Sequence, residues 1–290
     1  MATNDITTAF VQQYGRNIDI LSQQRGSILR NAVKVRPGVV GRTAYFDQLD
    51  ATAAVQKTVR NTDTPLIKSV HKRRQVTLYD WVWADLLDKE DQLKMLIDPT
   101  SDYVMNAAYA LGRAIDDTII AAFWADAVTG QEGASTETLP YAQMVTAGTT
   151  GLGLVKLLNA KKIFDNADVD PNVQRHIAIT GTQLADLLNT TEIKDADYNS
   201  VKALVNGEVN TFLGFNFHLC NRLTTGSTAS VRLCPAWATD GVALAIAKDL
   251  THRIEERSDK NYATQVFSSM GIGATRLEEA KVVQIGAYIG

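Results

Sequence analysis

The residues of this chain that could support catalysis or bind a metal are few and widely spaced. The whole sequence contains four histidines and two cysteines. His218 and Cys220 share one face of a predicted strand, and Cys234 follows further along the chain. A zinc site needs three or four converging ligands, and no further candidate has a suitable spacing. We therefore interpret these side chains as core residues, and we predict no metal site and no cofactor.

A covalent mechanism would require Cys220 to have a histidine partner in space. The candidates for that partner are His176, His218 and His252, and the sequence places none of them beside the thiol. The signatures Gly-x-Ser-x-Gly and His-Glu-x-x-His are both absent from the sequence. An unrecognised two-domain enzyme therefore stays open only as the last of three hypotheses.

Two other patterns also have a structural interpretation. The cluster Gly148, Gly151 and Gly153 precedes a predicted helix but has neither Rossmann spacing nor the Gly-Lys-Ser/Thr of a P-loop. We interpret it as a flexible joint.

The neighbouring carboxylates Asp116 and Asp117 lie on a predicted helix, where adjacent side chains point apart. They predict ion pairs or a solvated face, and not an acid/base dyad.

The densest basic cluster is His71-Lys72-Arg73-Arg74. It could bind phosphates, but alternate side chains of a strand point to opposite faces. The chain has 29 basic and 32 acidic residues, a formal net charge of −3, which argues against a nucleic-acid binder held by overall charge. We favour ion pairs between this cluster and the acidic surface of another copy.

These residues are positioned by the secondary structure of a chain of 290 residues, which is long enough for about two domains at roughly 150 residues each. Residues 1–40 are polar and poorly periodic, which predicts an arm ordered only against something else. Residues 41–85 predict two long extended segments joined by a turn at 61–65. About 15 residues per segment at about 3.3 Å each reach roughly 50 Å. A polar hairpin of that length predicts a protrusion that packs on a neighbour.

The clearest helix is predicted over residues 100–126, after the start signal Asp98-Pro99. Its apolar residues recur at helical spacing: Val104, Ala108, Leu111, Ile115, Ile119 and Ala122. About 27 residues give a beam of roughly 40 Å. A second helix is predicted over about 152–165.

Residues 172–250 predict a compact α+β unit of short elements. A buried strand over 176–180 is followed by a helix over 181–189 that begins with a cap-like Thr182. Residues 251–290 predict two long strands that are joined near Gly271 and Gly273 and cross back to the first part of the chain.

The chain shows no secretory signal and no apolar run long enough to span a membrane. Two cysteines are too few for a disulfide framework. We therefore expect synthesis in a cytoplasm, and no membrane partner.

The order of these parts resembles the major capsid proteins of tailed bacteriophages, which share the Hong Kong 97 fold. DPTSDYVMNAAYALGRAIDDTIIAAF looks like the spine helix of that family. The other stretches that carry the resemblance are LGLVKLLNAKKIFDNADVD, RHIAITGTQLADLLNTTEIKDADYNS and VNGEVNTFLGFNFHLCNRL, which look like a second P-domain helix, the entry to the A-domain, and part of the A-domain. The resemblance covers nearly the whole chain. It lies in the order of the predicted parts and in the local sequence pattern of these stretches.

The resemblance implies an α+β fold with named parts. These are an N-arm (1–40), an E-loop (41–85), a P-domain (86–171) with its spine helix (100–126) and β-sheet, an A-domain (172–250), and P-domain return strands (251–290). It also implies contacts between subunits through the E-loop. The candidates are its basic residues Lys57, Arg60, Lys68, His71, Lys72, Arg73 and Arg74.

The function that the resemblance implies is structural and not enzymatic. Many copies would form hexamers and pentamers that close into an icosahedral shell, enclosing double-stranded DNA without sequence-specific binding. The expected partners are a portal and, in some cases, decoration proteins. Because the arm follows Met1 almost at once, we expect the scaffolding protein either to be a separate chain or not to be used. The expected location is the virion capsid, assembled in the bacterial cytoplasm. The runner-up is an encapsulin-like compartment shell.

Overall fold

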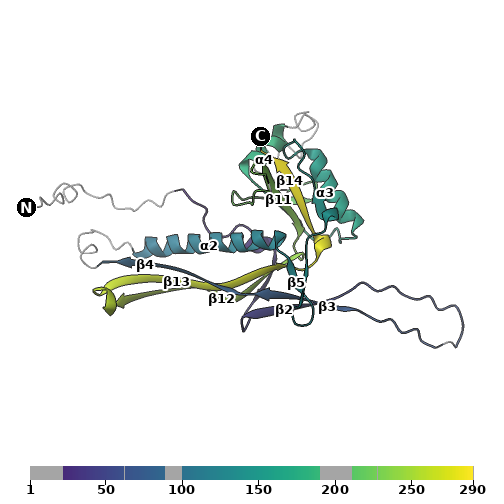
Figure 1. Cartoon of the computed structure of the whole chain (residues 1–290), viewed down its shortest axis with the longest axis horizontal. Coiled ribbons are helices and arrows are strands. Elements are labelled where there is room, and N and C mark those ends of the chain that lie inside the picture. The colour runs from purple at the N-terminus through teal and green to yellow at the C-terminus, as the bar shows by residue number, and fades with distance from the viewer. Residues whose placement is uncertain (1–21, 62, 89–99, 190–210, 227, 290) are drawn as a thin grey trace, which may run out of the picture.

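The structure is a computed structural model that describes residues 22–61, 63–88, 100–189, 211–226 and 228–289. It is an α+β architecture. A long helix lies along a sheet of long strands, a second sheet with two helices stands at one end of that helix, and a small third sheet carries a projecting loop (Figure 1).

The long helix α2 (Thr100–Trp124) ends two residues before the predicted boundary. Its 25 residues span roughly 38 Å. The predicted apolar positions Leu111, Ile115 and Ile119 are buried, and the helix packs mainly on the central strand of the long sheet. None of the helices in the described part of the chain combines the length and apolar character needed to cross a membrane.

The long sheet has the strand order β1-β12-β13-β4. Its strands are β1 (Lys34–Pro37), β12 (Val242–Arg257), β13 (Ala263–Arg276) and β4 (Tyr79–Leu87). Strand β12 runs without a break through residue 250, so the predicted boundary between a compact unit and return strands falls inside one strand.

The turn between β12 and β13 lies at 258–262, where Asn261 adopts a left-handed conformation with φ 51°. The prediction of a junction near Gly271 and Gly273 is wrong, because both glycines lie inside β13. Gly273 is needed for close approach instead: a Cβ on it would lie 2.3 Å from the backbone oxygen of Thr77.

The second sheet has the order β7-β14-β11-β8-β10-β9. Its strands are β7 (Met144–Val145), β14 (Val282–Tyr288), β11 (Val231–Ala238), β8 (Arg175–Ile179), β10 (Phe215–Leu219) and β9 (Thr211–Phe212). The last strand, β14, belongs to this sheet and not to the long sheet, and it pairs with β11 and with β7 from the earlier part of the chain.

The helices of this unit are α3 (Leu154–Asn166) and α4 (Gly181–Asn189). The predicted strand and helix over 176–189 are confirmed to within one residue. The cap, however, is Thr180 and not Thr182: the backbone N–H of Thr180 donates to Oε1 of Gln183 at 3.3 Å, as in a capping box.

Trp237 joins the second sheet to the rest of the subunit. It is fully buried, its ring lies 4.8 Å from that of Phe123 at the end of α2, and its Nε1 donates to the Ala32 oxygen at 2.7 Å. One hydrophobic core therefore runs from the second sheet to the long helix and the N-arm.

The third sheet has the order β2-β3-β5-β6. Its strands are β2 (Thr43–Leu49), β3 (His71–Thr77), β5 (Ala127–Thr129) and β6 (Ser135–Glu137). Strands β3 and β4 are separated only by Leu78, yet they belong to different sheets. The prediction of one continuous extended segment there is wrong, since Leu78 is buried and its N–H donates to the Arg42 oxygen at 2.8 Å.

Between β2 and β3 the chain projects away from the body (Figure 1). We call residues 50–70 the distal segment. Its two ends are paired by a backbone hydrogen bond of 3.0 Å from Asp50 N to Val70 O, and every described residue of 51–70 is exposed. This is the protrusion that the sequence predicts.

The described part of the N-arm, residues 22–40, is held by contacts with its own subunit, contrary to the expectation for residues 1–40. Asp116 on α2 is fully buried and accepts hydrogen bonds from the backbone N–H groups of Ile28 and Leu29, both at 3.0 Å. Its carboxylate also accepts from Ser27 Oγ at 2.5 Å and from the Gln24 amide. Residues 1–21 lie outside the described part of the chain.

We expect Asp116→Ala to lower the free energy of unfolding of the unassembled subunit by about 3 kcal/mol, because two buried backbone N–H groups lose their acceptor. Urea denaturation measures this. The neighbouring Asp117→Ala is the matched control: it breaks a half-exposed pair with Arg222 and should cost under about 1 kcal/mol. Equal losses in both variants would contradict the assignment.

Candidate assembly surface

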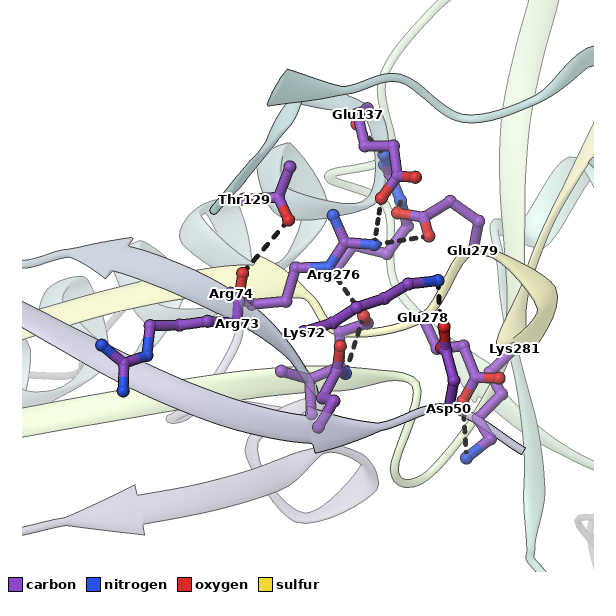
Figure 2. A network of polar contacts seen from close by, with 12 residues as sticks. Asp50, Lys72, Arg73, Arg74, Thr129, Glu137, Arg276, Glu278, Glu279 and Lys281 are labelled. Carbon is purple, nitrogen blue, oxygen red and sulfur yellow. Dashed lines mark hydrogen bonds and ion pairs between the residues drawn. The ribbon is translucent and has the colours of Figure 1, made fainter. Parts of the chain in front are cut away.

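The base of the E-loop is held by a network of charged side chains from several elements (Figure 2). Arg74 on β3 is 3% exposed. Its Nε donates to the Leu277 oxygen at 3.0 Å and its Nη2 donates to Oε2 of Glu279 at 2.7 Å. The same Nη2 forms an ion pair with Glu137 on β6. The β3 strand is thereby tied to the connection between β13 and β14.

Arg276, the last residue of β13, is fully buried. Its Nη1 donates to the oxygens of Phe123 at 2.9 Å and Ala125 at 3.1 Å, and its Nη2 donates to the Glu137 oxygen at 2.8 Å. The guanidinium therefore satisfies carbonyls at the C-terminal end of α2, where a positive charge is favourable. Burial lowers the pKa of Arg276 from its ordinary value, but a guanidinium stays protonated at neutral pH.

Glu279 lies between the two arginines. Its Oε2 accepts from Arg74, and its Oε1 accepts from Nε of Arg276 at 3.4 Å. One carboxylate thus joins the E-loop base to the end of the spine helix (Figure 2). This contact is one of those that hold the base of the E-loop against the body.

A second set of contacts surrounds the first. Lys281 pairs with Asp240 at 2.7 Å and with Glu278 at 2.9 Å. Lys72 pairs with Asp50 at 3.0 Å, at the point where the distal segment begins. These partners are more exposed than Arg74 and Arg276, so they hold the junction less strongly.

The structure separates the seven predicted contact residues into two groups. Lys57, Arg60 and Lys68 lie on the distal segment, with His71 at its end, and all four are exposed. None of the first three makes an ion pair with a described residue of its own chain. Lys72, Arg73 and Arg74 lie on β3, and each pairs with a carboxylate of the same chain.

For Arg74 the expected contact with another copy is corrected, because its guanidinium is buried inside its own subunit, where Nη2 pairs with Glu137 and Glu279. Arg73 points the opposite way, as strand alternation predicts. Its Nε lies 2.6 Å from Asp47 and its guanidinium covers the Tyr45 ring at 5.2 Å.

Sequence reasoning missed the partners Arg276, Glu279 and Glu137. The available signal was an arginine at the end of the otherwise apolar and small GIGATR stretch, followed three residues later by a glutamate. A charge at such a core position has to be paired. The distance to Arg74 along the chain hid the pairing.

Of the residues considered for catalysis, four lie in or beside the second sheet, namely His176, His218, Cys220 and Cys234, whereas His252 lies exposed on β12 of the long sheet. Nδ1 of His176 lies 3.0 Å from Nε2 of His218, and both rings stack on Trp237. Burial raises the pKa of the Cys220 thiol, and raises that of Cys234 to about 12, so neither is a thiolate at neutral pH. Among the described residues no group of three His, Cys, Asp or Glu side chains is arranged to hold a metal ion.

We expect Glu279→Gln to lower the free energy of unfolding by about 3 kcal/mol, because two buried guanidiniums lose their shared counter-charge. Thermal or urea denaturation of the unassembled subunit measures the loss. Asp259→Asn is the control, since its pair with Arg257 is exposed and should contribute little to stability. A Glu279→Gln loss no larger than the control's would contradict the role of the bridge.

The histidine pair predicts a loss of stability in acid. Burial, and then the charge of His218, lowers the pKa of His176 from 6.5 to about 4. Between these values the unfolded chain binds a proton that the folded chain does not. Stability is therefore complete above pH 6.5 and falls toward pH 4, approaching about 1.4 kcal/mol per pH unit.

Denaturation at a series of pH values tests this, with His176→Gln expected to flatten the dependence. His252→Gln, at an exposed position hydrogen-bonded to Ser268, is the matched histidine control. Identical pH profiles for the wild type and His176→Gln would show that the pair is not responsible.

A family model described as phage capsid protein matches residues 6–288. None of the curated proteins matches the chain. The alternatives that the sequence left open, an encapsulin-like shell and an enzyme, gain no support from these comparisons.

Solved capsid structures share the fold over nearly the full chain. The capsid of the cyanophage P-SCSP1u superposes with a TM-score of 0.73 at 16% identity, covering 98% of this chain and 95% of that one. The capsid of Ralstonia phage GP4 gives 0.72 at 10% identity, covering 96% and 95%. The capsid of cyanophage Pam1 gives 0.67 at 14% identity, covering 100% and 99%.

The expected fold is thereby confirmed as Hong Kong 97-like. The matched range leaves out only the first five and last two residues of the chain. The chain belongs to the phage capsid protein family, and it is a structural subunit of the capsid of a bacteriophage virion.

Proposed function

We propose that this chain is the major capsid protein of a tailed bacteriophage, and that its copies assemble as hexamers and pentamers into an icosahedral shell around double-stranded DNA. The observation that carries the proposal is the distal segment, which projects from the body and whose described residues over 51–70 are all exposed. A segment of this kind gains stabilising contacts only from other copies.

The side chains of the distal segment fit such a role. Leu66 is 95% exposed, and Val55, Val59, Ile67 and Val70 are about half exposed or more. Burying apolar surface contributes about 25 cal/mol per Å². Contacts of this size are weak singly, but they act together when each copy both gives and receives one.

The inter-subunit contacts that we propose involve the exposed basic residues of the E-loop. Lys57, Arg60, Lys68 and His71 are free of ion pairs with described residues of their own chain, so another copy can pair with them. Lys72 and Arg73 keep partly exposed side chains and can add a second carboxylate. Arg74 is left out of this set because it is buried.

The charge distribution supports confinement of DNA without sequence-specific binding. The net charge is −3, and the basic residues of β3 are already matched by carboxylates of the same chain. A wall of this kind repels DNA little and holds it little. We also propose assembly in the host cytoplasm with a portal and, where they are used, separate scaffolding or decoration proteins, and no enzymatic activity.

Replacing residues 51–69 by Asn-Gly should abolish shell formation and leave the subunit folded. Asp50 and Val70 are already hydrogen-bonded, so a two-residue turn can close the shortened hairpin. The Arg74–Glu279 contact lies outside the deletion and stays intact. Electron microscopy and light scattering measure assembly, and circular dichroism with urea denaturation measures folding.

The matched control keeps the length of the distal segment but replaces Thr52, Thr58 and Ser69 by alanine, which changes neither charge nor large apolar side chains. It should assemble as the wild type does. Normal shells from the deletion variant would refute the role of the distal segment. A wild-type chain that stays monomeric with every assembly partner supplied would refute the proposed function.

A further inference from the structure

We propose that the open edge of strand β4 receives the distal segment of a second copy as an added β-strand, with residues 51–59 as the strand that pairs. This inference rests on the proposed shell function and specifies which surface receives the E-loop. It follows from four observations on β4 and the distal segment.

The first observation is the open edge itself. Strand β4 is the last strand of the long sheet and pairs on one side with β13. On its other side it makes no backbone hydrogen bond to a described residue. An edge strand of nine residues presents a row of N–H and C=O groups that can pair with another chain.

The second observation is apolar exposure along the same strand. Tyr79 is 61%, Trp81 40%, Val82 57% and Leu86 44% exposed. In a strand, odd and even positions face opposite sides of the sheet. Strand β4 therefore leaves apolar side chains uncovered on both faces of its edge, which is costly unless a partner covers them.

The third observation is complementary charge. Strand β4 carries Asp80 and Asp85 and no basic residue, and neither carboxylate forms an ion pair with a described residue. The distal segment carries Lys57, Arg60 and Lys68 against two carboxylates, Asp50, which pairs with Lys72, and Asp63. Its positive side chains and the carboxylates of β4 are of opposite sign, and neither set forms an ion pair with described residues of its own copy.

The fourth observation is a match of length and composition. Residues 51–59, ATAAVQKTV, contain neither proline nor glycine and are rich in β-branched residues. They number nine, as β4 does. The other leg of the distal segment contains Pro65, which lacks the N–H that a paired strand needs.

Strand β4 and the distal segment lie at opposite ends of one copy (Figure 1). The β2–β3 hairpin points away from β4, and its base is fixed by the Arg74–Glu279 contact. The distal segment of a copy therefore does not reach its own β4. The occupant of the β4 edge is the distal segment of a neighbouring copy.

The test joins two singly substituted chains in one shell. One chain carries Val82→Cys on β4, and the other carries Ala53→Cys, Val55→Cys or Lys57→Cys. The native Cys220 and Cys234 are fully buried and do not interfere. Mixed chains are assembled, oxidised mildly and separated on a non-reducing gel, with one chain enlarged by a tag so that the mixed dimer is identified.

The matched control replaces Val82→Cys by Leu158→Cys, on an exposed position of α3. We expect at least one of the three pairs to give mixed dimer about tenfold above the control, because a disulfide needs Cα atoms within about 7 Å. Shells with no mixed dimer above the control would overturn the inference and leave the proposed function standing. Failure of the wild-type chain to form shells would count against the proposed function instead.

A second measurement on the wild-type chain covers the case in which the substituted chains do not assemble. Amide hydrogen exchange across Tyr79–Leu87 is compared between free subunits and shells. Strand addition should slow exchange at alternate residues of β4 by about tenfold or more, since newly bonded N–H groups exchange only after opening. Unchanged exchange across β4 in assembled shells would overturn the inference.

Discussion

The structure depends on two buried guanidiniums that share one carboxylate. Arg74 and Arg276 carry like charges out of water, which is tolerable only when a carboxylate balances those charges. Glu279 supplies the shared negative charge, and the carbonyls of Leu277 and Phe123 take further donors. Any shift of the E-loop base would separate these partners and leave a charge unpaired. The junction between the E-loop and the spine helix is therefore stiff, while the distal segment beyond it stays free to adapt.

Local patterns predicted the elements whose formation is itself local. The helix α2, the strand β8 and the helix α4 lie within two residues of their predicted bounds, because apolar periodicity and turn residues act over a few positions. Pairing between distant strands was not predictable in this way. Nothing local shows that the chain changes sheets at Leu78, since the change depends on an oxygen 36 residues earlier, at Arg42. A glycine such as Gly273 also has the same sequence signal whether it makes a turn or admits a close neighbour.

The candidate contact residues show the same limit. Charge density identified the basic cluster on β3, and strand alternation correctly separated Arg73 from Arg74. The sequence could not show that Arg74 faces inward, because its partner Glu279 lies 205 residues away. Exposure of the distal segment was predictable from its polar composition and its length. The inward arginine and the outward lysines therefore differ in role although they share one short stretch of chain.

The two surfaces proposed to bind each other, the distal segment and the β4 edge, lie at opposite ends of one copy, and this placement limits how copies can associate. In the pairing proposed above, the distal segment at one end and the β4 edge at the other are different surfaces, so copies would join head to tail, and the rotation between successive copies would decide whether they close into a ring. The Glu279 bridge fixes the angle between the E-loop base and the long sheet within each copy. The proposed rings of five and of six would need slightly different rotations from the same chain. The tolerance for that difference lies in the distal segment, which has no helix or strand of its own in its described residues and can bend without disturbing the buried charges at its base.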